Sequence, residues 1–234
     1  MLIPSQSWGE DIAINSSLIT CNLDEIKQNI VHCKVKIIAV TKYFGRQAIV
    51  SGYEAGLRDF AESRAQDAVS KIESLPNEIK ENSTFHFIGH LQSNKVNKVV
   101  KVCDVIHSVD SLKIASEISK VACSLNKREK ILLQINNAGE EQKSGYTKEQ
   151  LKNELKDIIA LEGIEVRGLM NMAPLDAGEQ ELTRLFRDVR EFRDELEKEF
   201  SISLPELSMG MSDDYKVAVR EGATMIRIGR KLFT

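Results

Sequence analysis

Eight short runs of apolar and β-branched residues recur along the chain, and stretches with helical spacing separate them. Turn residues bound each run, which is the pattern of short buried strands. Strands that alternate with helices predict a parallel sheet, and eight of them predict a single (β/α)8 TIM barrel, an α/β fold. An open doubly wound sheet is the alternative. The predicted strands are residues 36–41, 59–61, 84–88, 105–108, 131–136, 166–170, 206–209 and 224–228.

Two capping signals mark helix starts between and before these strands. Asn22 followed by Glu25 resembles a capping box, and it predicts an additional N-terminal helix that runs to about Val31. Thr147 with Gln150 gives a second capping box, which predicts a helix before the sixth strand.

The domain organisation follows from the absence of a linker. The 234 residues include only four prolines and no Gly/Ser-rich run, and the most polar connection is predicted at residues 75–83. We therefore predict one domain over residues 1–234. Residues 1–35 are predicted to form an N-terminal helical extension that packs on the barrel.

Composition limits the function classes. The formal net charge of −3 gives no basic excess, so nucleic acid is not expected as a ligand. No apolar run approaches the length of a bilayer span, and the N-terminus lacks the pattern of a secretory signal, so no membrane is expected. The four cysteines form no C-x-x-C pair, which argues against zinc. A chain without a disulfide framework fits a reducing, cytoplasmic setting.

Lys42 stands where the first buried strand ends. Active sites of (β/α)8 barrels lie at the C-terminal ends of the strands. An ordinary lysine there rests its stem on the rim and keeps its ammonium in water, and position alone favours this interpretation. A desolvated lysine has a lowered pKa, and its free amine can form a Schiff base with a carbonyl.

The segments after the seventh and eighth strands are candidates for anion binding, because barrel phosphate sites often use these loops. Gly229 would let backbone N–H groups approach an anion closely. Ser212 could contribute a hydroxyl, although a simple helix N-cap explains it equally well. Asp213 and Asp214 argue against a phosphate at that turn unless they point away.

Arg227 is flanked by two isoleucines in the eighth predicted strand. Strand alternation points its side chain away from theirs, toward the barrel lumen or mouth, and a structural ion pair is the alternative. His86 alternates with two phenylalanines and is interpreted as a hydrogen-bonded core histidine. No dinucleotide fingerprint, Walker loop, zinc-protease helix or nucleophile elbow occurs.

Several segments together resemble the pyridoxal phosphate homeostasis proteins. They are "AVTK", "HFIGHLQSNK", "IHSVDS", "GLMNMAP", "LSMGMSDDYKVAVREG" and "IRIG", and the resemblance runs from about Lys36 to Phe233. It implies a barrel like the N-terminal domain of alanine racemase. It also implies that Lys42 holds pyridoxal 5′-phosphate (PLP) as a Schiff base, in a protein that buffers and delivers PLP inside the cell without established catalysis.

The resemblance further implies which residues meet the cofactor. Arg227 would lie near the pyridine nitrogen and keep it unprotonated, which weakens the cofactor as an electron sink. The phosphate would be held near the last two strand ends, by Ser208, Gly210, Ser212 and the backbone of Gly229 and Arg230.

Three positions depart from the family pattern. Tyr43 follows the lysine where relatives usually carry a proline, and Ser63 stands where an asparagine usually lies near the cofactor. Arg230 replaces the usual serine or threonine after the last glycine. These departures bear on affinity and exchange rate more than on PLP binding itself.

Two other functions stay open. A PLP-dependent amino-acid racemase needs a second base on the opposite face of the cofactor. In alanine racemase a tyrosine from another domain supplies that base, and we expect no such domain after Phe233, although the four tyrosines of this chain stay candidates. A barrel without cofactor would act as a scaffold. For the carrier, we expect a monomer whose partners are PLP and the apo-enzymes that receive it.

Overall fold

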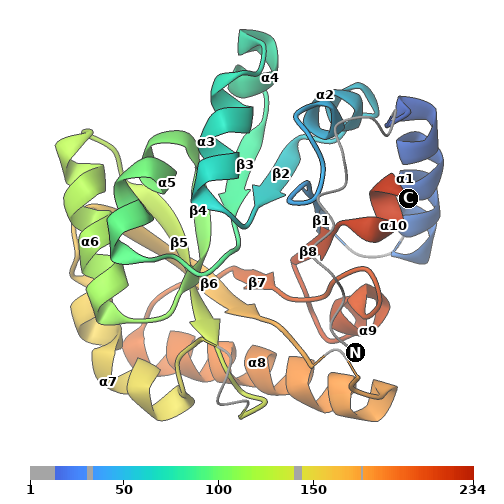
Figure 1. The fold of residues 1–234 in the computed structure, drawn as a ribbon. Helices are drawn as coiled ribbons and strands as arrows, with labels where there is room; N and C mark the ends of the chain where they lie inside the picture. The colour runs from blue at the N-terminus through green and yellow to red at the C-terminus, as the bar shows by residue number, and fades with distance from the viewer. Residues whose placement is uncertain (1–13, 31–33, 140–143, 175) are drawn as a thin grey trace.

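The computed structural model describes residues 14–30, 34–139, 144–174 and 176–234 (Figure 1). Eight parallel strands close into a barrel in the order of the chain, and β8 pairs with β1. The predicted (β/α)8 barrel with an N-terminal helix is therefore confirmed, and the open sheet is wrong. Figure 1 shows the helices arranged around the outside of the strands.

All eight predicted strands are present, and their ends differ from the prediction by at most two residues. They are β1 (Lys36–Val40), β2 (Asp59–Glu62), β3 (Thr84–Phe87), β4 (Val105–Val109), β5 (Glu129–Ile135), β6 (Ile164–Asn171), β7 (Glu206–Ser208) and β8 (Met225–Ile228). The helices are α1 (Ser16–Asn29), α2 (Gln47–Glu54), α3 (Ala65–Glu73), α4 (Asn77–Glu81), α5 (Val96–Val102), α6 (Leu112–Ser124), α7 (Lys148–Ile159), α8 (Glu179–Phe200), α9 (Tyr215–Arg220) and α10 (Arg230–Phe233), with a 3-10 turn at Ser93–Lys95 before α5.

The N-terminal helix begins earlier than predicted. The side chain of Asn15 accepts the N–H of Ser17 and caps α1, so Asn22 lies inside the helix and not at its start. Asn22 instead donates to the carbonyl of Leu232 in α10. Val31, the predicted end of the helix, lies outside the described residues.

The helix α1 packs on the end of the chain that follows β8. Lys231 pairs with Glu25 at 2.7 Å, and the Asn22 bond lies one residue further along α10. The hydroxyl of Ser51 in α2 donates to the carbonyl of Ile14. These contacts fix α10, and therefore the segment after β8, against the barrel wall. The domain boundaries themselves stay a prediction.

Two further local signals had different outcomes. The capping box at Thr147 and Gln150 is present at the start of α7, with both of its hydrogen bonds. The connection predicted at residues 75–83 contains the short helix α4, which buries Ile79 against the core. This helix was not predicted, because five residues are too few to show a helical period.

The barrel has two packing layers. A large outer core joins strands to helices, and a separate inner cluster contains only strand residues of the described barrel: Ile38, Val40, Ala61, Leu132, Met170 and Met225. Residues with the same alternation as this inner cluster therefore point into the lumen. Among the described residues, no helix combines the length and apolar character needed to cross a bilayer.

Candidate functional site

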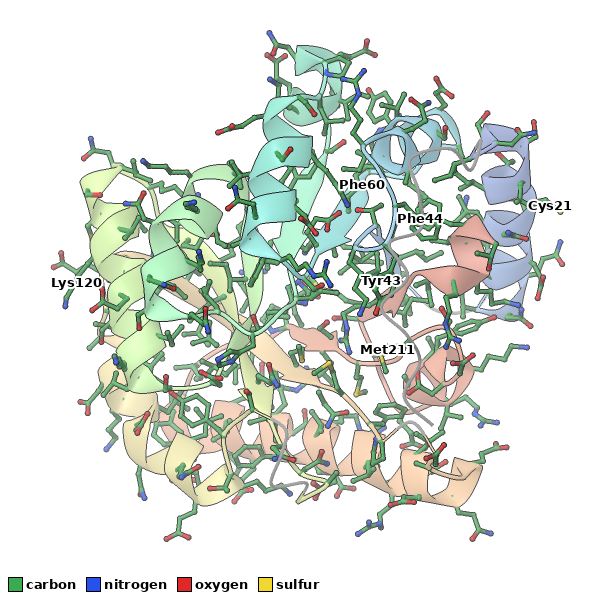
Figure 2. The ribbon with its side chains drawn as sticks, viewed as in Figure 1. Cys21, Tyr43, Phe44, Phe60, Lys120 and Met211 are labelled. Atoms are coloured by element: carbon green, nitrogen blue, oxygen red, sulfur yellow. The ribbon has the colours of Figure 1, made fainter. Side chains whose placement is uncertain are left out.

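Lys42 lies two residues beyond β1, in a turn at the C-terminal mouth of the barrel. The N–H of Phe44 donates to the carbonyl of Thr41 and closes the turn, and the ring of Phe44 packs on Phe233 at 4.9 Å between centroids. The Lys42 amine is 4.9 Å from the centroid of the Tyr43 ring. Figure 2 labels Tyr43 and Phe44 in this turn. Within the described chain no hydrogen bond or ion pair involves this amine, so no other protein group competes with a ligand for it.

A buried ion pair holds the other side of this turn. Lys71 of α3 donates to the carbonyl of Thr41 at 2.8 Å and pairs with Glu62 at 2.7 Å. The hydroxyl of Thr41 also donates to Glu62, which is 3% exposed. Burial raises the pKa of Glu62, and the charge of Lys71 opposes that shift. The backbone next to Lys42 is thus anchored to a charge pair that depends on both partners.

The loop after β7 requires glycine at position 210. Gly210 has a φ of +94°, which is left-handed, and an added Cβ would lie 2.6 Å from the Cβ of Ala218. The same Cβ would lie 3.0 Å from the Cα of Tyr215. Helix α9 therefore packs directly on this glycine. Met211, the next residue of the loop, is labelled in Figure 2.

Ser212 does not cap α9, because the N-cap is Asp214. The Asp214 carboxylate accepts the N–H of Met211, and Ser212 accepts the N–H of Lys231 at 3.5 Å. The loop after β7 thus touches the start of α10, so two of the segments predicted to bind phosphate lie side by side.

Arg230 points its charge to the surface. Its guanidinium pairs with Asp213 at 2.7 Å, and the two side chains are 70% and 77% exposed. The carboxylate of Asp213 is therefore engaged with a cation, and any role of Arg230 toward a phosphate is left to its backbone.

The side-chain packing around Gly229 leaves room for a Cβ. An added Cβ would lie 3.4 Å from the carbonyl oxygen of Val40, which is an ordinary contact. A glycine that the packing does not need fits a position that a ligand approaches closely.

Arg227 faces the barrel interior, as the alternation predicted, and is 3% exposed. Its Nη1 donates to the carbonyl and hydroxyl oxygens of Ser208, at 2.6 and 2.7 Å, and its Nη2 donates to the carbonyl of Asn171 at 2.8 Å. Burial lowers the pKa of Arg227 to about 10, against the attraction of Asp214, so the guanidinium stays charged at neutral pH. In the described chain no carboxylate forms an ion pair with it, so the structural ion pair considered as the alternative is not found.

Two donor and acceptor groups near the lumen mouth remain available. The bonds to Ser208 and Asn171 use three of the N–H groups of Arg227, and a guanidinium carries five. The Oδ1 atom of Asn171 is buried and has no hydrogen-bond partner among the described residues. A polar ligand with both a donor and an acceptor would satisfy these groups.

Sequence reasoning missed two groups that shape the site. The Lys71 anchor gives no sequence signal, because a helical lysine is usually solvated. His107 is fully buried and its Nδ1 lies 2.9 Å from the hydroxyl of Ser208. Its position inside a run of apolar residues in β4 was the available signal, because a buried polar side chain needs a partner.

Comparisons with known proteins agree with this geometry. The family profile described as "Alanine racemase, N-terminal domain" matches residues 14–234. The pyridoxal phosphate homeostasis protein of Synechocystis sp. is 46% identical over 201 residues, which cover 85% of this chain and 90% of that relative. The chain belongs to the family of pyridoxal phosphate homeostasis proteins.

Solved structures place this family member beside related barrels. PipY of Synechococcus elongatus PCC7942, solved with PLP bound, has a TM-score of 0.84 and 38% identity, and the match covers 92% of this chain and all of PipY. Alanine racemase of Clostridium difficile 630 is 18% identical with a TM-score of 0.77, and the match covers 94% of this chain but 57% of the racemase. That likeness shows the shared barrel fold alone.

The chemistry of the mouth fits the cofactor that the family name contains. PLP carries an aldehyde, a pyridine nitrogen and a phosphate. The unpaired Lys42 amine suits the aldehyde, the spare N–H groups of Arg227 suit the ring nitrogen, and the glycine-containing corner around Gly229 suits the phosphate. No cluster of three metal-ligating side chains occurs among the residues that the structure describes.

Proposed function

We propose that this chain binds PLP through a covalent bond between Lys42 and the aldehyde carbon, and that it buffers and delivers PLP inside the cell. The single observation that carries the proposal is the unpaired, half-buried amine of Lys42 at the barrel mouth. The relatives' name and the PLP-bound PipY support the choice of cofactor. Delivery to apo-enzymes is the finer part of the proposal, and we expect a monomer.

Each segment of the mouth has a separate task in the proposal. Lys42 supplies the nucleophilic amine, and bound PLP supplies an electrophilic carbonyl and an electron-withdrawing ring. Arg227 donates a hydrogen bond toward the ring nitrogen. Ser208, Gly210, Ser212 and the backbone of Gly229 and Arg230 form the wall that receives the phosphate.

The proposal does not include catalysis. Racemisation needs a base on each face of the cofactor. Tyr146 is buried and donates to Glu154, and burial first, then this carboxylate, raise its pKa. Tyr43 contacts Lys42 and so lies on the lysine side. An assay of L-alanine and L-serine racemisation tests this part, and turnover that requires Lys42 would support the racemase instead.

The aldehyde and phosphate contacts can be tested separately. Lys42→Ala should lose the absorbance change that accompanies covalent binding, yet retain PLP in equilibrium dialysis through the phosphate wall. An unchanged absorbance response in Lys42→Ala would overturn the assignment of the amine.

Gly229→Ala tests the phosphate wall without disturbing the fold. Because the added methyl group meets only ordinary contacts, the variant should melt with the wild type but bind PLP more weakly, by about tenfold for a loss of 1.4 kcal/mol. Gly45→Ala is the matched control, since nothing lies within 4 Å of its added Cβ. Equal affinities in the two variants would count against a phosphate at Gly229.

A further inference from the structure

A continuous line of buried polar side chains crosses the barrel from Arg227 to the opposite end. Arg227 donates to the Ser208 hydroxyl at 2.7 Å, and this hydroxyl lies 2.9 Å from the Nδ1 of His107. The Nε2 of His107 lies 2.9 Å from the Nδ1 of His86. The Nε2 of His86 lies 3.0 Å from the carboxylate of Asp59. Each strand from β2 to β4, together with β7 and β8, contributes one member.

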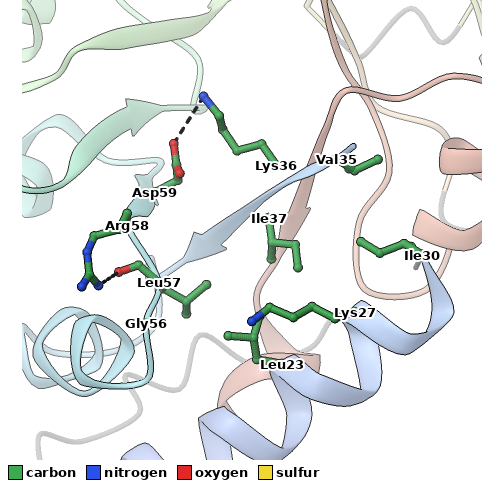
Figure 3. Close-up of a pocket in the computed structure, with 10 residues that line it drawn as sticks. All are labelled: Leu23, Lys27, Ile30, Val35, Lys36, Ile37, Gly56, Leu57, Arg58 and Asp59. Carbon is green, nitrogen blue, oxygen red and sulfur yellow. Dashed lines mark hydrogen bonds and ion pairs between the residues drawn. The ribbon is translucent and has the colours of Figure 1, made fainter. Parts of the chain in front are cut away.

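The two ends of this line differ in their access to water. Ser208, His107 and His86 are at most 1% exposed, whereas the side chain of Asp59 is 18% exposed. Asp59 also pairs with Lys36 at 3.6 Å, beside a surface pocket of about 440 Å³ (Figure 3). Figure 3 shows this ion pair. Lys36 and Asp59 are the first residues of β1 and β2, so the pair lies at the end of the barrel opposite Lys42. Protons from solvent can therefore enter this line of hydrogen bonds at Asp59 but not at its buried members.

With both ends charged and both histidines neutral, hydrogen-bond chemistry allows one ordering along this line. An arginine can only donate, so the Ser208 oxygen accepts from Arg227. An ionised Asp59 can only accept, so neutral His86 and neutral His107 each carry their proton on Nε2, and the Nδ1 of His107 is left to accept the Ser208 proton. The proton of His107 must then sit on Nε2 and point to the Nδ1 of His86.

His86 completes the ordering in the same sense. Its proton sits on Nε2 and is accepted by the ionised Asp59. Every donor along the line then has an acceptor. All of the hydrogen bonds donate in the same direction, from the Arg227 cation to the Asp59 anion.

We propose that Asp59 is a remote positioning residue for Arg227, acting through His86, His107 and Ser208 as one proton-ordered chain. The carboxylate fixes the tautomer of His86, which fixes that of His107, and the Ser208 oxygen then presents its lone pair to the guanidinium. A carboxylate that sets a histidine tautomer in this way is known from hydrolase triads. This inference rests on the proposed function only where the bound cofactor serves as a reporter.

The surroundings favour the neutral form of the central histidine. Burial lowers the pKa of His107 well below its usual value, and the charges of Arg227 and Lys36 act in the same direction. Asp214 faces Arg227 from the loop before α9. From β5 and β6 the inner cluster contains the apolar side chains of Leu132 and Met170.

Histidine nitrogen NMR on the protein without cofactor tests the ordering directly. In protein labelled with ¹⁵N histidine at pH 7.5, we expect His86 and His107 to carry their protons on Nε2 and to leave Nδ1 unprotonated. The signals are assigned by loss in His86→Gln and His107→Gln, and His90 and His32 give the remaining resonances. A proton on Nδ1 of either His86 or His107 in the wild type would overturn the inference, whether or not PLP binds.

Paired variants then separate positioning from simple structural support. Asp59→Asn removes the negative end of the chain, and its amide can turn a donor toward His86. Loss of that charge disfavours a cationic group in the site, so the pH midpoint of the bound cofactor's absorption should shift to lower pH. Lys36→Met removes the ion pair at the pocket and a positive charge that acts on His107, so its midpoint should shift to higher pH. Equal midpoints in Asp59→Asn and Lys36→Met would overturn the positioning role.

Discussion

Lys71→Met should weaken both the barrel and the turn that carries Lys42. The substitution leaves Glu62, at 3% exposure, as an unpaired buried carboxylate and removes the bond to the carbonyl of Thr41. Breaking a buried pair from one side costs about 3–5 kcal/mol. For a chain of this size each kcal/mol lowers the melting temperature by about 2–4 °C, so we expect a decrease of roughly 6–20 °C at pH 8.

The loss should depend on pH with a defined sign. Burial raises the pKa of Glu62 and Lys71 opposes the shift, so removing Lys71 raises this pKa further above its unfolded value. A group with a raised folded pKa binds its proton more tightly in the native state. The contribution of Glu62 to the free energy of unfolding is then full below about pH 4.5. It is lost as pH rises through the folded pKa, by up to about 1.4 kcal/mol per pH unit. The variant should therefore differ least from the wild type in acid.

Thermal melts at pH 5 and pH 8 provide the assay. Lys120→Met is the matched control, because Lys120 is 72% exposed and its pair with Glu117 is a surface pair worth about 0–1 kcal/mol (Figure 2). Adding Glu62→Gln to Lys71→Met should recover most of the loss, since no charge is then left buried. A Lys71→Met variant that melts with Lys120→Met, or whose deficit is the same at both pH values, would refute this reasoning.

Two further predictions concern the mouth and the lumen. Gly210→Ala should destabilise by about 2 kcal/mol or more, because its Cβ would lie 2.6 Å from Ala218 at a left-handed φ, whereas Gly45→Ala should stay within about 0.5 kcal/mol in the same denaturant titration; equal midpoints would contradict the steric account. His107 has a depressed folded pKa, so the unfolded state takes up the proton first and stability should fall below about pH 6.5, by up to about 1.4 kcal/mol per unit. His107→Gln should flatten this slope in urea titrations between pH 5 and 7, and an unchanged slope would remove His107 as its source.

The barrel could be predicted from sequence because its information is local. Each strand is a short apolar run between turn residues, and eight such runs have one closed arrangement with right-handed crossovers. The prediction from Asn22 was wrong because a polar residue can either cap a helix or lie within it and contact another helix. Asn22 lies within α1 and donates to the carbonyl of Leu232 in α10. The difference between those uses depends on a partner more than 200 residues away.

The candidate site likewise contains features that local sequence patterns predict and features that depend on long-range contacts. The position of Lys42 just beyond a strand end was predictable from the apolar run, and the inward direction of Arg227 was predictable from strand alternation. The pair of Glu62 with Lys71 was not, because a helix and a strand end must be docked before their charges meet. The helix N-cap considered as one interpretation of Ser212 is not found, because its partner is the N–H of Lys231 in another element. Long-range docking is the part that local patterns do not contain.

Reduction with borohydride followed by peptide mass mapping tests the central claim most directly. The purified protein is saturated with PLP, reduced, digested and mapped, with Lys42→Ala treated in parallel. The account predicts a pyridoxyl-phosphate adduct on the peptide that contains Lys42, and no adduct of comparable yield in the variant. A folded wild type that carries no adduct on Lys42, or the same adduct pattern in Lys42→Ala, would contradict the account.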